Sequence, residues 1–366
     1  MKISASSSGQ ERLGVKSVRI AERIVGPDQP CFVIAEAGVN HNGDVTLAHK
    51  LIEAAADAKV DAVKFQTFDP EKVAAAEAHK ANYQVKNTGE EGSQLSMLRK
   101  LVLPPSVYPE LIQHAAQKNL IFLSTPFDEN SSDFLEEMSL PAFKVSSGDL
   151  TNHPFLAHLA RKGRPLLLST GMGSLEQVKA AMKAVRTAGD PPLVLFHCVT
   201  SYPANASDCN LRAMKTLRSQ FSVPVGWSDH TVGFDVSLAA VALGATVLEK
   251  HFTLDRTLPG PDHVASLEPS ELSAMVTAIR RVESALGDGI KQPRECEVSI
   301  ADVARRSLYW KKDLQQGATA TAADVIALRP GTGISPERLA LYVDRQVVRK
   351  VRKGKMLDDQ DFARVK

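Results

Sequence analysis

Short apolar runs rich in β-branched residues recur along most of the chain, and a segment with helical periodicity follows nearly every one. The eight runs cover residues 31–38, 62–66, 121–126, 142–147, 166–171, 193–198, 223–229 and 247–252. Runs of this length are typical of buried parallel strands, and their alternation with helices indicates an α/β fold. Eight such units favour a (β/α)8 TIM barrel over an open doubly wound sheet, which usually has about five or six strands.

The segments between these runs carry apolar residues at helical spacing. In residues 47–59 they are Leu47, Leu51, Ile52, Ala55 and Ala58. Ser174 and Gln177 form a capping-box pattern at the start of another segment, and the last, residues 271–286, is followed by Gly287. These start and stop signals support the assignment of helices between the strands.

The pattern changes after residue 287. Residues 288–304 are polar, contain Pro293 and show no sustained period, which predicts a linker. Beyond it, short strand-like pieces at 307–310, 325–328 and 346–351 are separated by Gly and Pro, and they predict a small β-rich domain. The predicted organisation is an N-terminal extension (1–29), a barrel (30–287), a linker (288–304) and a C-terminal domain (305–366).

Composition and charge exclude several classes of protein. With 43% hydrophobic and 23% charged residues among 366, the chain can bury a sizeable core, so disorder is not its main state. Lys and Arg (44) nearly balance Asp and Glu (42), and a net charge of +2 gives no field of the kind that nucleic-acid-binding proteins carry. No apolar run approaches the roughly 18–20 residues that span a bilayer, and the polar start lacks the apolar stretch of a signal peptide. We expect a soluble, cytoplasmic protein that binds neither nucleic acid nor membrane.

The C-terminal domain is more basic than the rest of the chain. From residue 305 onward it contains fourteen Lys or Arg and seven Asp or Glu. This excess fits either a solvated basic surface or a basic lid over a site for anionic substrates, and the charge alone does not choose between them.

Polar residues gather where the predicted strands end. In a (β/α)8 barrel the catalytic groups lie at the C-terminal ends of the strands. Lys64 and Lys144 lie in otherwise apolar strands, and hydroxyl residues and glycines stand at the strand ends around them. This environment suits a phosphate or a phosphorylated carboxylate. Because a buried ammonium is costly unless it is paired, a purely structural role would require internal carboxylate partners.

Two histidines form a candidate metal site. His230 and His251 end the seventh and eighth strands, which are neighbours in a barrel, and closure brings Glu36 on the first strand beside them. Two imidazoles with carboxylates and water positions suit Mn²⁺, Mg²⁺, Co²⁺ or Fe²⁺. His41 is a further candidate, as a ligand or a substrate contact, and His197 and His263 stay open. The four cysteines are scattered without a C-x-x-C pair, so we expect them to be reduced and structural rather than zinc ligands.

Several motifs in this order resemble those of the sialic acid (nonulosonic acid) synthase family. They are IAEAGVNHNG (34–43), VKFQT (63–67), STPFD (124–128), SDHT (228–231), EKHFT (249–253) and GPDH (260–263). RRSL (305–308) and RPGTGI (329–334) resemble the family's C-terminal antifreeze-like (SAF) domain. The resemblance implies a transferase that condenses phosphoenolpyruvate with an N-acylated hexosamine and water, giving a nine-carbon sugar acid and phosphate. It also implies a homodimer in which one chain's SAF domain covers the partner's barrel.

The resemblance also implies roles for individual residues. The phosphoenolpyruvate contacts are Lys64, Thr125, Lys144, Ser147, Ser169 and Ser228, and the sugar contacts are Gln66, Tyr202, Asp262 and Arg329. The catalytic residues are Glu36, Asp149, His230 and His251. The two histidines would hold a divalent metal, foremost Mn²⁺, with Mg²⁺ or Co²⁺ as alternatives. Many family members have Glu where this chain has Asp149, which leaves the direct role of this shorter side chain open.

In the implied mechanism, the enol carbon of phosphoenolpyruvate attacks the metal-polarised sugar aldehyde, water adds to C2, and phosphate leaves with C–O cleavage. Three alternatives stay open: a Schiff-base aldolase using Lys64 or Lys144, another phosphoenolpyruvate-condensing sugar acid synthase, and an ice- or carbohydrate-binding protein without catalysis. A binding protein without catalysis would leave the polar residues at the strand ends unexplained. Residues 37–39, 83–84 and 87–89 are more similar to synthases of legionaminic acid, whose acceptor is 2,4-diacetamido-2,4,6-trideoxymannose, than to users of N-acetylmannosamine.

Overall fold

The computed structural model describes residues 14–88 and 92–363. It divides after Gly287 into two compact units, and each is described by itself. Residues 1–13 of the predicted N-terminal extension lie outside the described residues, as do 364–366. Gly89, one of the residues in the 87–89 segment singled out above, also lies outside them.

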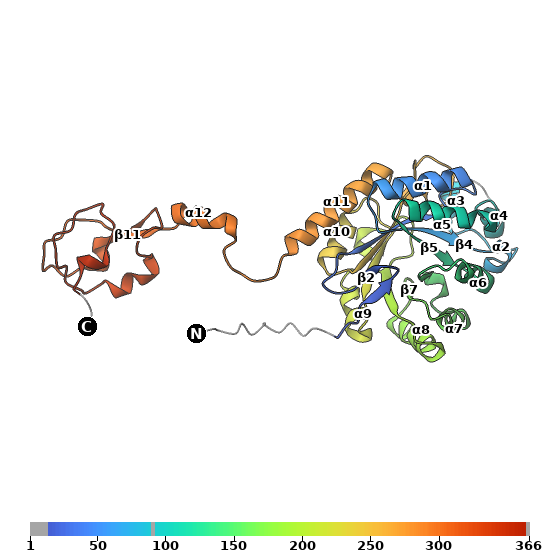
Figure 1. Ribbon diagram of the computed structural model, residues 1–366, viewed down its shortest axis with the longest axis horizontal. Coiled ribbons are helices and arrows are strands. Elements are labelled where there is room, and N and C mark those ends of the chain that lie inside the picture. The colour runs from blue at the N-terminus through green and yellow to red at the C-terminus, as the bar shows by residue number, and fades with distance from the viewer. Residues whose placement is uncertain (1–13, 89–91, 364–366) are drawn as a thin grey trace. The chain divides into compact units, whose positions relative to one another are not determined.

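The first unit is built around eight parallel strands that curl into a nearly closed barrel (Figure 1). The strands are β3 (Phe32–Gly38), β4 (Ala62–Thr67), β5 (Ile121–Pro126), β6 (Phe143–Val145), β7 (Leu166–Ser169), β8 (Leu193–Cys198), β9 (Val225–Asp229) and β10 (Val247–His251). Their order in the sheet is β5-β4-β3-β10-β9-β8-β7-β6, and β5 also contacts β6. The predicted (β/α)8 barrel is therefore confirmed.

Helices follow the strands and cover the outside of the barrel (Figure 1). They are α1 (Val45–Asp57), α5 (Tyr108–Gln117), α6 (Glu129–Glu137), α7 (His153–Arg161), α8 (Leu175–Ala188), α9 (Ala213–Phe221), α10 (Asp235–Ala242) and α11 (Pro269–Leu286). The predicted capping box of α8 is present, because the side chains of Ser174 and Gln177 each accept a hydrogen bond from the other's backbone N–H. Among the described residues, no helix is long and apolar enough to cross a membrane.

The connection from β4 to α5 is longer than the others and contains three short helices. These are α2 (Pro70–Val73), α3 (Asn82–Thr88) and α4 (Gln94–Arg99). The periodicity of the apolar residues did not reveal them, because helices of one or two turns are too short to establish a period. They lie at the C-terminal side of the barrel strands, where they contribute to the candidate site described below.

Two apolar layers stabilise the barrel. Along β3, Val33 points outward and packs in the cluster between sheet and helices, whereas Phe32 and Ile34 point inward. The inward cluster also contains residues of an N-terminal hairpin, β1 (Val18–Ile20) and β2 (Arg23–Val25). Part of the predicted N-terminal extension therefore closes the N-terminal end of the barrel, and the opposite end is left for polar side chains.

The second unit is a small domain that contains the two strands predicted at 307–310 and 325–328, β11 (Ser307–Trp310) and β12 (Val325–Leu328), and the structure pairs them antiparallel. Its core is a separate apolar cluster. The strand predicted at 346–351 is not formed as a continuous strand, so that prediction is wrong. Gln346 and Val351 form isolated antiparallel bridges to Thr319 and Leu314, whereas Val347 bridges to Phe362, so the pairing is interrupted and no continuous ladder forms.

The segment predicted as an irregular linker contains a helix, α12 (Glu295–Ala304), so the prediction is wrong for these residues. Two glutamates in its first turn are favourable at a helix N-terminus. Its apolar residues Val298, Ile300 and Val303 are 56%, 61% and 67% exposed. These side chains do not form an apolar stripe that packs against a neighbouring core. The apolar residues of this segment therefore show no clear helical period in the sequence.

We predict that a chain ending at Gly289 folds into the barrel by itself. All described members of the barrel's apolar clusters precede Gly287, and the second unit has its own cluster. Circular dichroism should therefore show one cooperative thermal transition and the helical signal of a (β/α)8 barrel. A shortened chain that melts without cooperativity, while the full chain melts cooperatively, would contradict this.

Candidate active site

A cavity of about 300 Å³ opens at the C-terminal ends of the barrel strands. The lining residues include almost all of the predicted site residues: Glu36, Lys64, Gln66, Thr125, Lys144, Ser147, Ser169, Tyr202, Ser228, His230, His251 and Asp262. The strand register explains why they meet. Glu36 on β3 lies beside Lys64 on β4 and beside His251 on β10. Side chains that are far apart in the sequence therefore share one end of the barrel.

The two lysines are paired with buried carboxylates and with hydroxyl groups. Lys64 Nζ lies 2.7 Å from Glu36 Oε2 and 3.7 Å from Glu249 Oε2, and Lys144 Nζ lies 3.5 Å from Glu249 Oε1. Lys64 also donates to Thr125 Oγ1 (2.8 Å), and Lys144 donates to Ser169 Oγ (2.7 Å). The internal partners required by a purely structural role are thus present. Both ammonium groups nevertheless line the cavity, where an anionic ligand can reach them.

Sequence reasoning did not assign a role to Glu249, which lies between the two lysines. Its carboxylate accepts a hydrogen bond from Ser228 Oγ (3.1 Å). A signal was available, because Glu249 precedes His251 by two positions and so points to the same face of the strand. A carboxylate within an apolar strand, on the face of a predicted metal ligand, marks a site residue.

The two carboxylates differ in their proton affinity. Burial raises the pKa of Glu36 to about 7, against the opposing effect of Lys64. Burial also acts to raise the pKa of Glu249, but Lys144 and Lys64 together lower it to about 2. One carboxyl group can therefore exchange a proton near neutral pH while its neighbour stays ionised, an arrangement suited to acid–base chemistry.

His230 and His251 face each other across neighbouring strands, with ring centroids 5.6 Å apart. His230 Nδ1 donates to the Val199 carbonyl (2.7 Å), which leaves its Nε2 as an acceptor, 3.4 Å from Ser228 Oγ. Nδ1 of His251 is buried without a hydrogen-bond partner. Burial lowers the pKa of His230 to about 4 and that of His251 well below its ordinary value. Neutral imidazoles with an unsatisfied nitrogen fit a divalent metal. Within 14–88 and 92–363, no group of three or more His, Cys, Asp or Glu side chains forms a metal site, so oxygens of water or substrate would complete the coordination.

A cradle of small polar side chains lies beside Lys144. Ser147 Oγ accepts from the Gly171 N–H (2.9 Å) and lies 3.1 Å from Cys198 Sγ. A Cβ atom at Gly171 would come within 2.4 Å of Thr200 Oγ1, so this position requires glycine. The sequence reasoning missed Thr200 as a lining residue. It also expected only a structural role for Cys198, a free thiol that lines the cavity.

Tyr202 and Asp262 also line the cavity. The Tyr202 ring packs on His230, with centroids 4.2 Å apart, and meets the His251 ring edge-on at 5.7 Å. Burial raises the pKa of Asp262 to about 6. Gln66 Nε2 donates to Glu36 Oε1 (3.1 Å) and so orients that carboxylate.

Two segments of the chain match the sequence models of known families. Residues 51–291 match the sequence model of the NeuB family, and residues 305–363 match that of the SAF domain. The chain belongs to the NeuB family. The family resemblance of the motifs is thereby confirmed, and the chain is expected to be an enzyme of the synthase type.

Individual relatives are similar over nearly their whole length. The N,N'-diacetyllegionaminic acid synthase of Campylobacter jejuni is 45% identical over 328 residues, which are 89% of this chain and 98% of that protein. The N-acetylneuraminate-9-phosphate synthase of Homo sapiens is 37% identical over 330 residues, 89% of this chain and 91% of that protein. A crystal structure of N-acetylneuraminic acid synthetase from Leptospira borgpetersenii, in complex with citrate, has a TM-score of 0.70 at 35% identity and covers 78% of this chain and 95% of that one.

Some residues singled out in the sequence do not line the cavity of this NeuB-family barrel. Asp149 lies just outside it, where it accepts a hydrogen bond from Asn152 Nδ2 (3.2 Å). Arg329 belongs to the second unit and is exposed. His41 is buried below the cavity, and its Nδ1 accepts from the Gly43 N–H. His197 bonds to the Cys209 carbonyl and His263 to Thr253, so both have structural partners.

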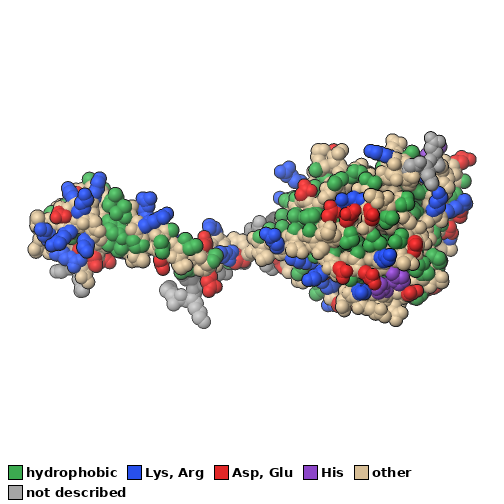
Figure 2. All heavy atoms as spheres, turned by 90° about the horizontal axis from the view of Figure 1, so that it is seen from above, with side chains coloured by type: hydrophobic (Ala, Val, Ile, Leu, Met, Phe, Trp, Pro, Cys, Tyr) green, Lys and Arg blue, Asp and Glu red, His purple; other side chains and the backbone are tan. Residues whose placement is uncertain are grey.

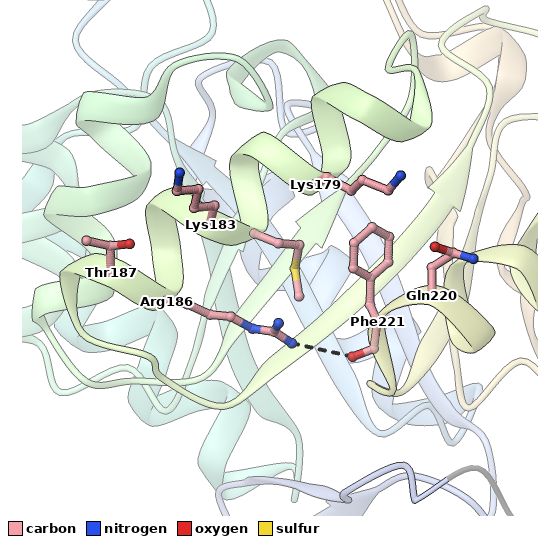
Figure 3. Close-up of a pocket in the computed structure, with 7 residues that line it drawn as sticks. Lys179, Lys183, Arg186, Thr187, Gln220 and Phe221 are labelled. Carbon is pink, nitrogen blue, oxygen red and sulfur yellow. Dashed lines mark hydrogen bonds between the residues drawn. The ribbon is translucent and has the colours of Figure 1, made fainter.

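A second hollow, of about 440 Å³, lies on the outside of the barrel between α8 and α9 (Figure 3). Lys179, Lys183 and Arg186 line it, and Arg186 donates to the Phe221 carbonyl (3.4 Å). It contains none of the predicted site residues and lies away from the strand ends. The chemistry of this NeuB-family chain is therefore assigned to the cavity inside the barrel mouth.

We predict that Glu249→Gln lowers the free energy of unfolding by about 3 kcal/mol, because the change leaves two buried ammonium groups to share one carboxylate. Urea unfolding would measure this. Glu176→Gln is the matched control, since Glu176 pairs with Lys179 on the exposed face of α8 and its loss should cost at most about 0.5 kcal/mol. Equal costs for the two changes would contradict the role of Glu249.

Proposed function

We propose that this chain condenses phosphoenolpyruvate with an N-acylated hexosamine and water to give a nine-carbon sugar acid and phosphate. One observation carries the proposal: two lysines with a hydroxyl cradle lie in the same cavity as two neutral imidazoles and a carboxyl group of near-neutral pKa. Membership of the NeuB family supports it, as do relatives named legionaminic acid and N-acetylneuraminate-9-phosphate synthases.

The lysine side of the cavity would bind phosphoenolpyruvate. Lys64 and Lys144 donate charge-assisted hydrogen bonds to its phosphate and carboxylate oxygens, in part replacing their bonds to the internal carboxylates. Thr125, Ser147, Ser169 and Ser228 add hydroxyl groups around the same anion. The ammonium groups also stabilise the charge that builds on the phosphate as it leaves.

The imidazole side would bind the sugar in its open-chain form. His230 and His251 would hold a divalent metal, foremost Mn²⁺, which supplies Lewis-acid polarisation of the aldehyde when bound. Carbon C3 of the enol forms a bond to the aldehyde carbon, and the aldehyde oxygen takes up a proton to become a hydroxyl group. A water oxygen adds to C2, and the C–O bond to phosphate then breaks, which leaves a keto group at C2 and releases phosphate. Glu36 can accept the proton of that water because its pKa lies near neutrality. Tyr202 and Asp262 position the sugar.

An assay of phosphate release from phosphoenolpyruvate, with each candidate sugar and with its 6-phosphate, tests the function. Release should require both substrates and water. Lys144→Met should raise the KM for phosphoenolpyruvate by about 10-fold or more, because the charge-assisted hydrogen bond from the Lys144 ammonium to this substrate is lost. An unchanged KM for phosphoenolpyruvate together with a raised KM for the sugar would overturn the assignment of this side of the cavity.

We predict that excess EDTA abolishes phosphate release and that added Mn²⁺ restores it. His251→Ala should lose turnover with little change in the circular dichroism spectrum, because one of two imidazole ligands is removed. His158→Ala on α7 is the control, since this side chain bonds to Asp133 outside the cavity and should not affect turnover. Full activity in EDTA would refute the metal's role.

We propose further that the chain works as a homodimer in which the second unit of one chain covers the barrel of the other. Exposed apolar side chains support this, since Val298 and Val303 on α12 and Leu328 on β12 are 56%, 67% and 41% exposed. Lys and Arg side chains surround an apolar patch on this unit (Figure 2). Arg329 would then donate paired hydrogen bonds to the N-acyl carbonyl of a sugar bound by the partner chain.

We predict that mixing Arg329→Ala chains with His230→Ala chains restores part of the activity that both variants lack on their own. One of the two sites in a mixed dimer then combines an intact barrel with an intact Arg329 from the other chain. Phosphate release measured after subunit exchange checks this. No recovery, with exchange demonstrated by labelled chains, would show that Arg329 does not act across the dimer.

A Schiff-base aldolase is the second candidate, and one observation favours it. Burial lowers the pKa of the Lys144 ammonium, which increases the fraction of nucleophilic amine. Borohydride reduction in the presence of pyruvate would trap an imine as a stable adduct on Lys144. The condensation without a covalent intermediate predicts no adduct.

A further inference from the structure

Two histidines face each other on the outside of the barrel, away from the active-site cavity. His49 lies on α1 and His114 lies on α5, and these two helices pack side by side (Figure 1). The two Nδ1 atoms are 2.8 Å apart, and the ring centroids are 4.9 Å apart. Neither ring lines the active-site cavity, so the His49–His114 pair takes no part in the proposed condensation.

A carboxylate lies near the other nitrogen of each ring. His49 Nε2 lies 3.3 Å from Glu110 Oε1 on α5, and His114 Nε2 lies 4.0 Å from Glu53 Oε1 on α1. His49 and Glu53 are one helical turn apart, and so are Glu110 and His114. Each helix therefore contributes one imidazole and one carboxylate, and each ring has its Nε2 close to the carboxylate of the other helix.

The two carboxylates favour the same tautomer in both rings. A neutral imidazole has one N–H group and one lone pair, whereas an ionised carboxylate only accepts hydrogen bonds. An N–H group is favourable beside such an anion, so Glu110 and Glu53 favour a hydrogen atom on Nε2 of each ring. Both Nδ1 atoms then present lone pairs to each other across 2.8 Å. Two lone pairs at this distance require a positive charge between them, which is either a proton or a metal ion.

A divalent transition metal fits this position after a small movement of the rings. Zn–N bonds of about 2.05 Å at a tetrahedral angle place two ligating nitrogens about 3.3 Å apart, so the Nδ1 atoms need to separate by about 0.5 Å. Side-chain rotation can supply this, because the two imidazoles are 24% and 17% exposed. The helix backbones stay in place, since Leu51 on α1 and Leu111 on α5 are buried in the same apolar cluster.

The surrounding charges also suit a bound cation. A metal-ligating imidazole usually donates its other N–H group to a carboxylate, which orients the ring and makes the ligating nitrogen more basic. Glu110 and Glu53 lie beside the nitrogens where this role requires them. Lys118, which follows α5, opposes a cation at His114, but the two carboxylates outnumber this one ammonium group.

We propose that the His49–His114 pair binds one divalent transition-metal ion of the class that prefers imidazole ligands, such as Zn²⁺, through both Nδ1 atoms. Water oxygens complete the coordination, because the carboxylates lie at the opposite ring nitrogens. With two protein ligands instead of the usual three or four, the ion exchanges readily with solution. It links α1 to α5 and stabilises the barrel from outside, so this site is separate from the metal site proposed inside the barrel.

Isothermal titration of the full chain with Zn²⁺, without an affinity tag, tests the site. The starting protein is His230→Ala/His251→Ala, in which the proposed barrel site has lost both imidazoles. We expect one Zn²⁺ to bind at the His49–His114 pair. Adding His49→Ala or His114→Ala should raise the Kd by about 100-fold or more, and Glu110→Gln should raise it by about 10-fold because the ring loses its carboxylate partner. Circular dichroism would verify that each variant is folded.

His158→Ala in the same starting protein is the matched control. His158 lies on α7, 2.7 Å from Asp133, and among the described residues it packs on no second imidazole, so its loss should leave the Kd unchanged. Zn²⁺ at about 100 times the Kd should also raise the melting temperature of the starting protein by roughly 5 °C, but not that of the His49→Ala variant.

Two results would overturn the proposal. One is Zn²⁺ binding that keeps the same Kd in both His49→Ala and His114→Ala. The other is the absence of Zn²⁺ binding to the starting protein, which would show that a shared proton alone occupies the space between the rings. Neither result bears on the proposed condensation, because the phosphate-release assay tests a different part of the barrel.

Discussion

Two buried lysines and two buried carboxylates share one end of the barrel. The rest of the active site depends on the balance between their positive and negative charges. Lys64 lies between Glu36 and Glu249, and Lys144 lies beside Glu249, with each of these side chains at most 5% exposed. Removed from water, none of these charges would be tolerated alone. Together they form an arrangement in which each ammonium group is balanced by an internal carboxylate.

This balance explains why a structural and a functional interpretation of the lysines both fit. The ion pairs keep the empty barrel stable, and the cavity keeps the same ammonium groups within reach of a ligand. An incoming phosphate has more charge than either carboxylate and can form more hydrogen bonds. The same competition gives Glu36 and Glu249 different pKa values, because Glu249 has both lysines as partners and Glu36 has one.

The barrel strands and the connections between them contribute different kinds of side chain to the active site. The strands provide the charged and hydroxyl groups at fixed register, over an interior layer that contains Phe32 and Ile34 and is closed by the N-terminal hairpin. The long β4–α5 connection adds apolar side chains to the lining, among them Met97, Leu98 and Leu101. Rigid strands suit the groups that must meet reacting atoms, and a packed connection can change from one family member to another without disturbing them.

The sequence by itself determined the eight strand–helix units, the polar strand ends and most of the polar residues that line the cavity, because each follows from local periodicity or from motifs that resemble a known family. It did not reveal α12, whose exposed valines form no stripe. The lack of a continuous strand at 346–351 was also not evident, because the pairing partners there lie in distant segments. Only the tertiary structure decided that Glu249 balances both lysines, that Asp149 lies outside the cavity, and that one side of the cavity is apolar. Those properties depend on distances between residues brought together by barrel closure, and no local pattern in the chain encodes them.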